Sequence, residues 1–505
     1  THAQKLLTPL RAAGRGNPRV EGDDDPSIYK CRGATIENIL QFEHQYPAAR
    51  VVRLEQNYRS TQNILDAANR VIANNEGRKG KQLWTGNGAG AALVWQTCDD
   101  ERAEARAIAD AIEKNVAKGE SWGSHAVLYR ANALSNTIET QLVRAGVPYR
   151  IIGGHRFYDR KEIKDATAYL TVIANPADEV RLRRVVNEPK RGIGEATMQA
   201  AANIGARTGF GLYEVLRHAH EFPELSRAGA RLQGFIALIE ELRQARETLP
   251  LKDLLELTLQ RSGYMAALAQ DKETFEERKQ NLEELASNLM RYEEETEEPS
   301  LWGFLEDVAL QSDIDQYNAQ ADAVALMTLH SAKGLEFPHV FLPAWEERVF
   351  PSYQTVLSGA QDDLEEERRL AYVGITRAMQ SLTFTTARTR LLFGQTQYNP
   401  PSRFLRETGT EPEEIAPAYA PRKTVCAPVK PSEYVPRQQK PSAMPPKGAK
   451  KQCEVGQSVI HPTFGRGMVL SVKPMGSDTL LEVAFDTVGT KKLMANYAKL
   501  FNTHD

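Results

Sequence analysis

Alternation of short apolar runs with amphipathic segments marks the first part of the chain. Apolar runs suited to strands lie at 91–97, 125–130 and 147–152, and helical spacing fills the intervals at 100–119 and 137–146. Strands that alternate with helices of this length indicate a parallel sheet covered by helices. Upstream, the pattern predicts a helix over 36–47, a short strand at 51–54 and a helix over 63–75, with Ser60 or Thr61 as its N-cap.

The pattern changes between 159 and 316, where helical spacing is almost continuous and Leu282, Leu285 and Leu289 form one apolar stripe. Strand-like runs then return, with a helical stretch between the last two. These runs lie at 323–329, 339–345 and 381–387, and the helical stretch at 365–378. The pattern therefore predicts a single α/β domain that is interrupted by a helical insertion.

The last hundred residues divide into a proline-rich stretch and a small β module. Nine of the 26 prolines fall within 411–450, among scattered lysines and with almost no apolar periodicity. This composition is typical of an extended or disordered linker. Short apolar runs around glycine turns at 453–503 predict a small β-barrel.

Composition narrows the class of protein. A length of 505 residues favours three to four domains at ~150 residues each. The four cysteines lie far apart without C-x-x-C spacing, which excludes a disulfide framework and a cysteine-based zinc site. No apolar run approaches the ~18 residues of a membrane span, so we expect no integral membrane protein. A net charge of −3 does not by itself indicate a nucleic-acid-binding protein.

Four extended strings carry the chemistry of the chain. They are GDDDPSIYKCRGA at 22–34, LEQNYRST at 54–61, TLHSAKGLEFPHVF at 328–341 and EEERRLAYVGITRA at 365–378. In this order they resemble the later motifs of superfamily 1A helicases, the UvrD/PcrA/Rep family of 3′→5′ DNA helicases. FYDRKEIKDA at 157–166 and the C-terminal barrel extend the resemblance to nearly the whole chain.

The resemblance implies an α/β fold class in which a RecA-like parallel-sheet domain carries an inserted all-helical domain. The implied domains are a C-terminal remnant of RecA-like domain 1A at 1–50, domain 2A at 51–158 and 317–408, the inserted helical domain 2B at 159–316, a disordered linker at 409–452 and a Tudor-like barrel at 453–505.

Two arginines have the chemistry that ATP hydrolysis requires. Because negative charge builds on the γ-phosphoryl oxygens, permanently cationic, forked guanidinium groups are suited to stabilise them. Arg59 and Arg377 match the family's arginines that reach the γ-phosphate, and a surface salt bridge is the alternative for either one alone. Glu336 resembles the carboxylate that holds the ribose, with Lys333 one turn away. Tyr58 resembles the aromatic residue beside the nucleotide base, and the alternative is a buried core tyrosine.

Other residues match the family's contacts with single-stranded DNA. Tyr29 and Arg32 lie in the loop that carries the strand, where base stacking on aromatic side chains provides ~1–3 kcal/mol per base. Thr328 and His330 match the strand end that touches the DNA backbone, although a lone histidine is often structural.

The turn RGIGEAT at 191–197 enters a helix and resembles the duplex-contacting turn of the helical 2B domain. The amides at a helix start can bind a DNA phosphate, so Gly192 and Gly194 are candidate DNA-binding residues. A purely structural tight turn is the alternative.

The chain departs from the family pattern at two positions. Pro26 stands where the family usually has a glutamine that senses the γ-phosphate, and Cys31 stands where a tryptophan usually stacks on a base. Proline has no amide donor and a thiol has no π-face. Both changes should weaken the link between nucleotide state and DNA binding.

No segment matches the phosphate-binding pattern G-x-x-x-x-G-K-[ST]. The nearest candidates, GRKGKQ at 77–82 and PPKGAKK at 445–451, lack its spacing and its hydroxyl residue. No apolar strand ends in Asp-Glu, and the chain begins at Thr1 rather than at a methionine. We therefore expect a C-terminal fragment that holds no metal ligand of its own and is inactive alone, with the Mg²⁺ ligands upstream.

The resemblance thus implies part of an ATP- and Mg²⁺-dependent 3′→5′ helicase, an ATP hydrolase of the isomerase class, that translocates on single-stranded DNA and unwinds duplex in repair and recombination. Its implied partners are single-stranded DNA and single-strand/duplex junctions, with RNA polymerase and repair proteins at the barrel, in the bacterial cytoplasm on the nucleoid. The alternatives are a non-catalytic fragment that binds DNA or RNA polymerase, and a helicase–nuclease subunit. The second is disfavoured because the chain shows no nuclease-like carboxylate and lysine cluster.

Overall fold

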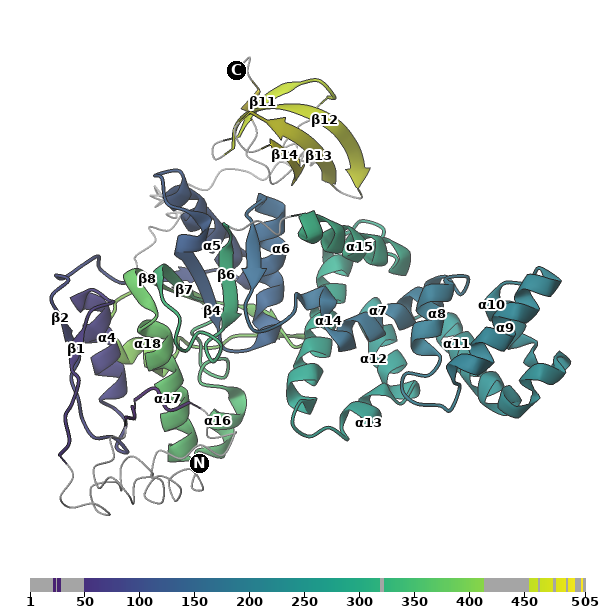
Figure 1. Cartoon of the computed structure of the whole chain (residues 1–505), viewed down its shortest axis with the longest axis horizontal. Coiled ribbons are helices and arrows are strands. Elements are labelled where there is room, and N and C mark those ends of the chain that lie inside the picture. The colour runs from purple at the N-terminus through teal and green to yellow at the C-terminus, as the bar shows by residue number, and fades with distance from the viewer. Residues whose placement is uncertain are drawn as a thin grey trace, which may run out of the picture. The chain divides into compact units, whose positions relative to one another are not determined.

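The computed structural model describes most of the chain (Figure 1). The described residues are 21–23, 25–28, 50–317, 322–412, 454–461, 464–475, 478–486, 489–495 and 501–502. The helix predicted at 36–47, most of the predicted remnant at 1–50, most of the predicted linker at 409–452, and Tyr29, Cys31 and Arg32 lie outside them. The chain divides into two units, Thr1–Glu411 and Pro412–Asp505. Within the described ranges, no helix has both the length and the apolar character of a membrane span.

A six-stranded sheet forms the centre of the first unit. Across the sheet its strands are β3 (Val94–Cys98), β8 (Ala378–Ala387), β7 (Phe337–Leu342), β4 (His125–Tyr129), β6 (Val324–Thr328) and β5 (Tyr149–Ile151). Every neighbouring pair is parallel. The central strand β4 is buried at all five positions, because a parallel sheet is covered on both faces. The sheet confirms the predicted α/β fold class.

Helices and short elements complete this α/β domain. They are β1 (Gln56–Asn57), α4 (Gln62–Ile72), β2 (Trp84–Thr85), α5 (Glu101–Val116), α6 (Ser135–Ala145), α16 (Tyr353–Ser358), α17 (Gln361–Ile375), β9 (Arg390–Leu392), β10 (Gln395–Gln397) and α18 (Arg403–Glu407). The strand predicted at 51–54 is wrong. Its apolar side chains are exposed, with Leu54 81% accessible, and strand pairing begins only at β1, which pairs with β2.

The helical insertion lies between β5 and β6 in the sequence and extends away from the sheet (Figure 1). Its helices are α7 (Lys161–Ala174), α8 (Glu179–Val185), α9 (Glu195–Thr208), α10 (Leu212–Arg217), α11 (Gly229–Ala245), α12 (Leu251–Arg261), α13 (Tyr264–Leu268), α14 (Phe275–Glu295) and α15 (Leu301–Tyr317). The predicted stripe of Leu282, Leu285 and Leu289 is buried in the core of this block.

A second side of α14, adjacent to the leucine stripe, is polar and faces the α/β domain. Its contacting side chains recur every three or four residues, and we call them the α14 ladder: Glu277, Asn281, Glu284, Asn288, Arg291 and Glu295. Asn136 of α6, for example, donates to Glu284 Oε1 at 3.2 Å and to Asn288 Oδ1 at 2.7 Å. Because hydrogen bonds are directional, the ladder fixes how the helical block meets α5 and α6.

The second unit contains a five-stranded antiparallel sheet. Its order is β14 (Gly489–Met494), β13 (Asp478–Phe485), β12 (Gly465–Met475), β11 (Ser458–His461) and β15 (Phe501–Asn502). Val459, Val469 and Leu481 are fully buried, and the ring of His461 stacks on Phe464 at 4.4 Å. These strands match the runs that predicted a small β module.

Candidate functional site

Arg59 and Glu336 form the centre of the candidate site. The Nε of Arg59 lies 2.5 Å from Oε2 of Glu336, and its Nη1 donates to the carbonyl of Thr376 at 3.3 Å. The Asn57 side chain positions Arg59, because its Oδ1 accepts the amide of Arg59 at 2.8 Å. The turn before α4, the start of β7 and the end of α17 therefore meet at one place.

Arg377 lies beside this pair and is buried. Its Nε, Nη1 and Nη2 donate to Val373 O, Leu335 O and Thr376 Oγ1 at 3.0 to 3.1 Å. Burial, followed by the positive charge of Arg59, lowers the pKa of Arg377 to about 10. Each Nη atom carries two hydrogens, so the guanidinium can still donate to a phosphate oxygen.

Lys333 is also at this site, but it is directed toward residues 25–28. Its Nζ donates to the carbonyl of Pro26 at 2.8 Å. Burial is the main cause that lowers the pKa of Lys333, and the charge of Arg377 acts in the same direction. Tyr58 is 78% exposed and donates to Gln56 Oε1 at 2.9 Å, so the alternative of a buried core tyrosine is wrong.

The candidate DNA residues on the sheet lie at its carboxyl edge. Thr328 ends β6, its Oγ1 accepts the amide of Ser331 at 3.2 Å, and His330 lies in the turn between them. Arg130, which follows the neighbouring strand β4, forms a bidentate pair with Glu367 of α17. Ligands of open parallel sheets bind at this edge.

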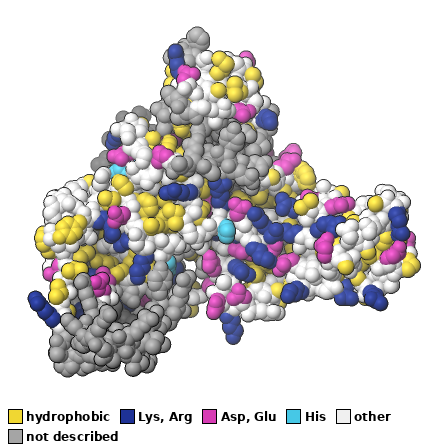
Figure 2. Space-filling model, in the orientation of Figure 1, with side chains coloured by type: hydrophobic (Ala, Val, Ile, Leu, Met, Phe, Trp, Pro, Cys, Tyr) yellow, Lys and Arg dark blue, Asp and Glu magenta, His cyan; other side chains and the backbone are white. Residues whose placement is uncertain are grey.

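The glycine turn of the helical block forms a helix start. Gly194 is the N-cap of α9, and a Cβ placed on it would meet no atom within 4 Å. Gly192 differs, because its φ of +71° is left-handed and its carbonyl accepts from Arg231 at 2.7 Å. Asn187 Oδ1 accepts the amides of Arg191 and Ile193, which flank Gly192. The first amides of a helix have no acceptor in a preceding turn. In α9 the amide of Thr197 already donates to the carbonyl of Gly194 at 3.0 Å, which leaves those of Glu195 and Ala196 as the candidates for a phosphate. Lys and Arg alternate with Asp and Glu over the block (Figure 2).

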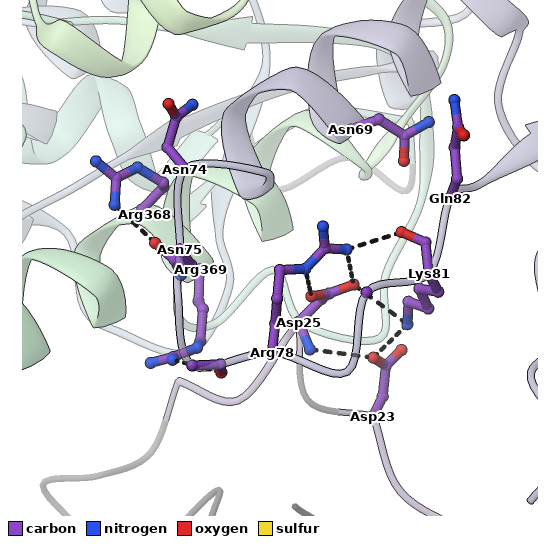
Figure 3. Close-up of polar contacts among 12 residues, drawn as sticks. Asp23, Asp25, Asn69, Asn74, Asn75, Arg78, Lys81, Gln82, Arg368 and Arg369 are labelled. Atoms are coloured by element: carbon purple, nitrogen blue, oxygen red, sulfur yellow. Dashed lines mark hydrogen bonds and ion pairs between the residues drawn. The ribbon is translucent and has the colours of Figure 1, made fainter.

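Sequence reasoning missed one group of charged residues (Figure 3). The buried carboxylate of Asp25 accepts from Arg78 Nε at 3.1 Å and Nη2 at 3.2 Å, and Lys81 pairs with Asp23. The signal was present in the sequence, because GRKGKQ at 77–82 is basic and GDDD at 22–25 is acidic. The phosphate-loop pattern, which the basic run does not match, gives no sign that its cations pair with the aspartates.

Among the residues that the structure describes, no three His, Cys, Asp or Glu side chains are grouped to hold a metal ion.

Comparison with known proteins adds two family matches. The sequence model of the UvrD-like helicase C-terminal domain matches residues 52–389, and that of the PcrA/UvrD tudor domain matches residues 455–500. The ATP-dependent DNA helicase PcrA of Staphylococcus epidermidis is 39% identical over 507 residues, covering 100% of this chain and 69% of the relative. The DNA helicase II of Salmonella typhimurium is 43% identical over 496 residues, covering 97% of this chain and 67% of the relative.

Proposed function

Because the chain belongs to the UvrD-like helicase family, we propose that it is the C-terminal part of a 3′→5′ DNA helicase that acts in DNA repair and recombination. Relatives in this family are ATP-dependent DNA helicases. The observation that carries the proposal is the convergence of Arg59, Glu336 and Arg377 at one place. The protein would work in the bacterial cytoplasm on the nucleoid.

ATP with Mg²⁺ supplies the phosphoryl group when it is bound. Arg59 and Arg377 bring two guanidinium groups that can neutralise the charge that develops on the γ-phosphoryl oxygens. Glu336 orients Arg59 through the 2.5 Å contact, and its half-exposed carboxylate can also accept a ribose hydroxyl. Tyr58 is exposed next to Arg59, where its ring can stack on the base. Lys333 adds positive charge to the same site.

The DNA contacts of this proposal fall on two surfaces. Single-stranded DNA would contact Thr328 and His330 at the carboxyl edge of the sheet, together with Tyr29 and Arg32. The duplex side of a junction would contact the start of α9 at Gly194, next to Gly192. Unwinding at a junction requires both contacts: the DNA single strand along the edge of the sheet and the duplex on the helical block.

ATP hydrolysis tests the proposal directly. The upstream part of such an enzyme brings the phosphate loop and the Mg²⁺ ligands, so the 505-residue chain alone should bind ATP weakly and show no DNA-stimulated hydrolysis. Joining it to the first RecA-like domain of a relative should produce DNA-stimulated ATPase and unwinding of a duplex with a 3′ single-stranded tail. Robust ATPase from the chain alone would contradict the fragment proposal, and unwinding only from a 5′ tail would contradict the polarity.

A second candidate function, binding to a protein partner, is favoured by the surface of the barrel. Ile460, Met468 and Leu470 are apolar side chains that are 37% to 49% exposed on neighbouring strands β11 and β12. An exposed apolar group of this kind is typical of a protein-interaction surface. RNA polymerase and repair proteins are the proposed partners. Deleting residues 412–505 should abolish capture of RNA polymerase while leaving DNA binding intact, and unchanged capture would contradict this role.

A further inference from the structure

Asp23 and residues 25–28 are fixed to the α/β domain by ion pairs and by one buried side chain. Asp25 is 2% exposed, and Arg78 binds both of its oxygens, while Lys81 Nζ lies 3.7 Å from Oδ2 (Figure 3). Ile28 is fully buried in the main core. A bidentate arginine–carboxylate pair defines orientation as well as distance. The segment is therefore held in one position.

The loop that supplies these cations is itself fixed to α17. Glu365 accepts the amide of Glu76 at 2.9 Å, and Arg369 holds the same carboxylate at 3.1 Å. Asn75 accepts from Arg368 at 2.7 Å and donates to the carbonyl of Glu365 at 3.0 Å. Figure 3 shows Asn75, Arg368 and Arg369 beside the Asp25 cluster. A continuous set of polar contacts thus runs from α17 through residues 75–81 to Asp25.

The same segment is held from the nucleotide side. Lys333 donates to the carbonyl of Pro26, and three residues later Glu336 pairs with Arg59. The helix α17 leads directly to Arg377. Residues 333–336 thus carry two residues of the candidate nucleotide site, and α17, which holds the loop at 75–81, ends two residues before a third, Arg377. In the sequence, residues 23–28 continue directly into Tyr29 and Arg32.

We infer that Arg78 and Lys81 are positioning residues for single-stranded DNA binding, which act by holding Asp25, and with it residues 26–28, against α17. The inference rests on the proposed function, because it takes the segment after Ile28 to contact the strand. Arg78 and Lys81 need not touch DNA themselves. Their effect on DNA should disappear when Asp25 no longer carries a charge.

Equilibrium binding by the full chain tests this inference. The variants are Arg78→Gln, Arg78→Lys, Lys81→Gln and Asp25→Asn, with Arg388→Gln as the matched control. Arg388 pairs with Asp99 on the exposed surface. Fluorescence anisotropy would give the affinity for labelled oligothymidylate and for a blunt duplex, and circular dichroism would give the unfolding temperature.

Loss of a charge-assisted bidentate pair should weaken oligothymidylate binding by Arg78→Gln about tenfold, with duplex binding changed less than about twofold. Arg78→Lys should restore part of the affinity, and Arg388→Gln should match the wild type. Arg78→Gln added to Asp25→Asn should cause little further loss, since the two residues act as one pair.

Each of the following outcomes would contradict either the proposed function or the positioning role of Arg78 and Lys81. A wild-type chain that fails to bind oligothymidylate would contradict the proposed function. If the wild-type chain binds oligothymidylate, two results for Arg78→Gln would overturn the positioning role alone. One is an equal loss of affinity for oligothymidylate and for duplex, and the other is no loss for either. If Arg78→Gln does not fold, Lys81→Gln and Arg78→Lys are measured in its place. Wild-type affinities of both variants for oligothymidylate relative to duplex would overturn the inference.

Discussion

Arg59 Nε lies 2.5 Å from Glu336 Oε2, although the two residues are 277 positions apart in the sequence. The pair joins the turn before α4 to the start of β7, and Thr376, which accepts from Arg59, precedes Arg377. Two guanidinium groups are thus held near each other by a single carboxylate and the end of one helix. Their mutual repulsion contributes to the lowered pKa of Arg377. Holding two positive charges close together costs free energy, and such an arrangement is typical of a site that binds an anion.

The first prediction concerns these arginines. In the chain joined to an upstream RecA-like domain, Arg59→Ala and Arg377→Lys should each lower DNA-stimulated ATPase by a factor of about 10³, because phosphoryl-transfer arginines contribute this much or more. Lysine is chosen at 377 because the buried guanidinium also supports three oxygen atoms of the fold. Steady-state ATPase with saturating oligothymidylate measures the effect, with Arg388→Gln as the control. Turnover above about a tenth of the parent's would remove either arginine from the site.

Much of the α/β domain follows from local pattern. Apolar runs bounded by amphipathic segments predict β3, α5, β4, α6 and β5 in their observed order, because each element in a parallel sheet is recognisable from its own residues. The strand expected at 51–54 is wrong because the prediction used local pattern alone. Its apolar residues satisfy the pattern, but pairing depends on a neighbouring strand, which local sequence does not specify.

The contacts of the candidate site were only partly predictable. The strings around Arg59, Glu336 and Arg377 single out three residues that the structure brings together, and their roles in ATP hydrolysis stay predictions. The destination of Lys333 was not, because a lysine has a flexible four-carbon stem and its partner is the carbonyl of Pro26, 307 positions away. The α14 ladder was not predictable either. The leucine stripe of α14 is visible in the sequence, whereas the partners of the polar ladder residues lie on α6 and before α7.

The second prediction concerns the glycine turn. Gly194→Val should weaken binding to a single-strand/duplex junction severalfold, because a branched side chain would occupy the open space before the first amides of α9. Binding to single strands should not change. Gly192→Val is the less informative variant, since a side chain there meets a left-handed φ and the Arg231 guanidinium. Anisotropy with both substrates makes the measurement, and equal loss on both would indicate misfolding instead of a lost duplex contact.

The third prediction concerns the buried histidine that begins β4, His125. The ring of His125 donates from Nδ1 to the carbonyl of Ser121 at 3.0 Å, and its Nε2 lies 3.2 Å from Asn115 Nδ2. Burial, and then the stacked ring of His339 at 4.9 Å, lowers the pKa of His125 below the ordinary 6.5. Glu120, which lies 3.7 Å from His339, opposes this shift. The folded protein therefore prefers the neutral ring.

The direction of the pH effect follows from linkage. As pH falls through about 6.5, the unfolded chain takes up the proton first, so stability decreases until the lower folded pKa is reached. His125→Asn should reduce the fall in unfolding temperature between about pH 7.5 and pH 5.5, even if its stability at neutral pH is lower. The control is His220→Asn, at an exposed position, which should keep the wild-type slope. An unchanged slope in His125→Asn would assign the pH dependence to other groups.

The last prediction concerns the buried polar contacts between α6 and the helical block. Arg160 is 7% exposed, and its guanidinium donates to Asn281 Oδ1 of the α14 ladder at 2.8 Å and to Ser135 Oγ of α6 at 2.9 Å. Removing one partner from a buried charged network leaves the others without compensation, which costs about 3 kcal/mol. Arg160→Ala should therefore lower the free energy of denaturant unfolding by about that amount and speed proteolysis between α7 and α14. Arg261→Ala removes an arginine from an exposed pair with Glu241 within the same block, and it should leave both measurements unchanged. If the two variants behaved alike, the helical block would be held by its apolar contacts, and the ladder would have no part in its attachment.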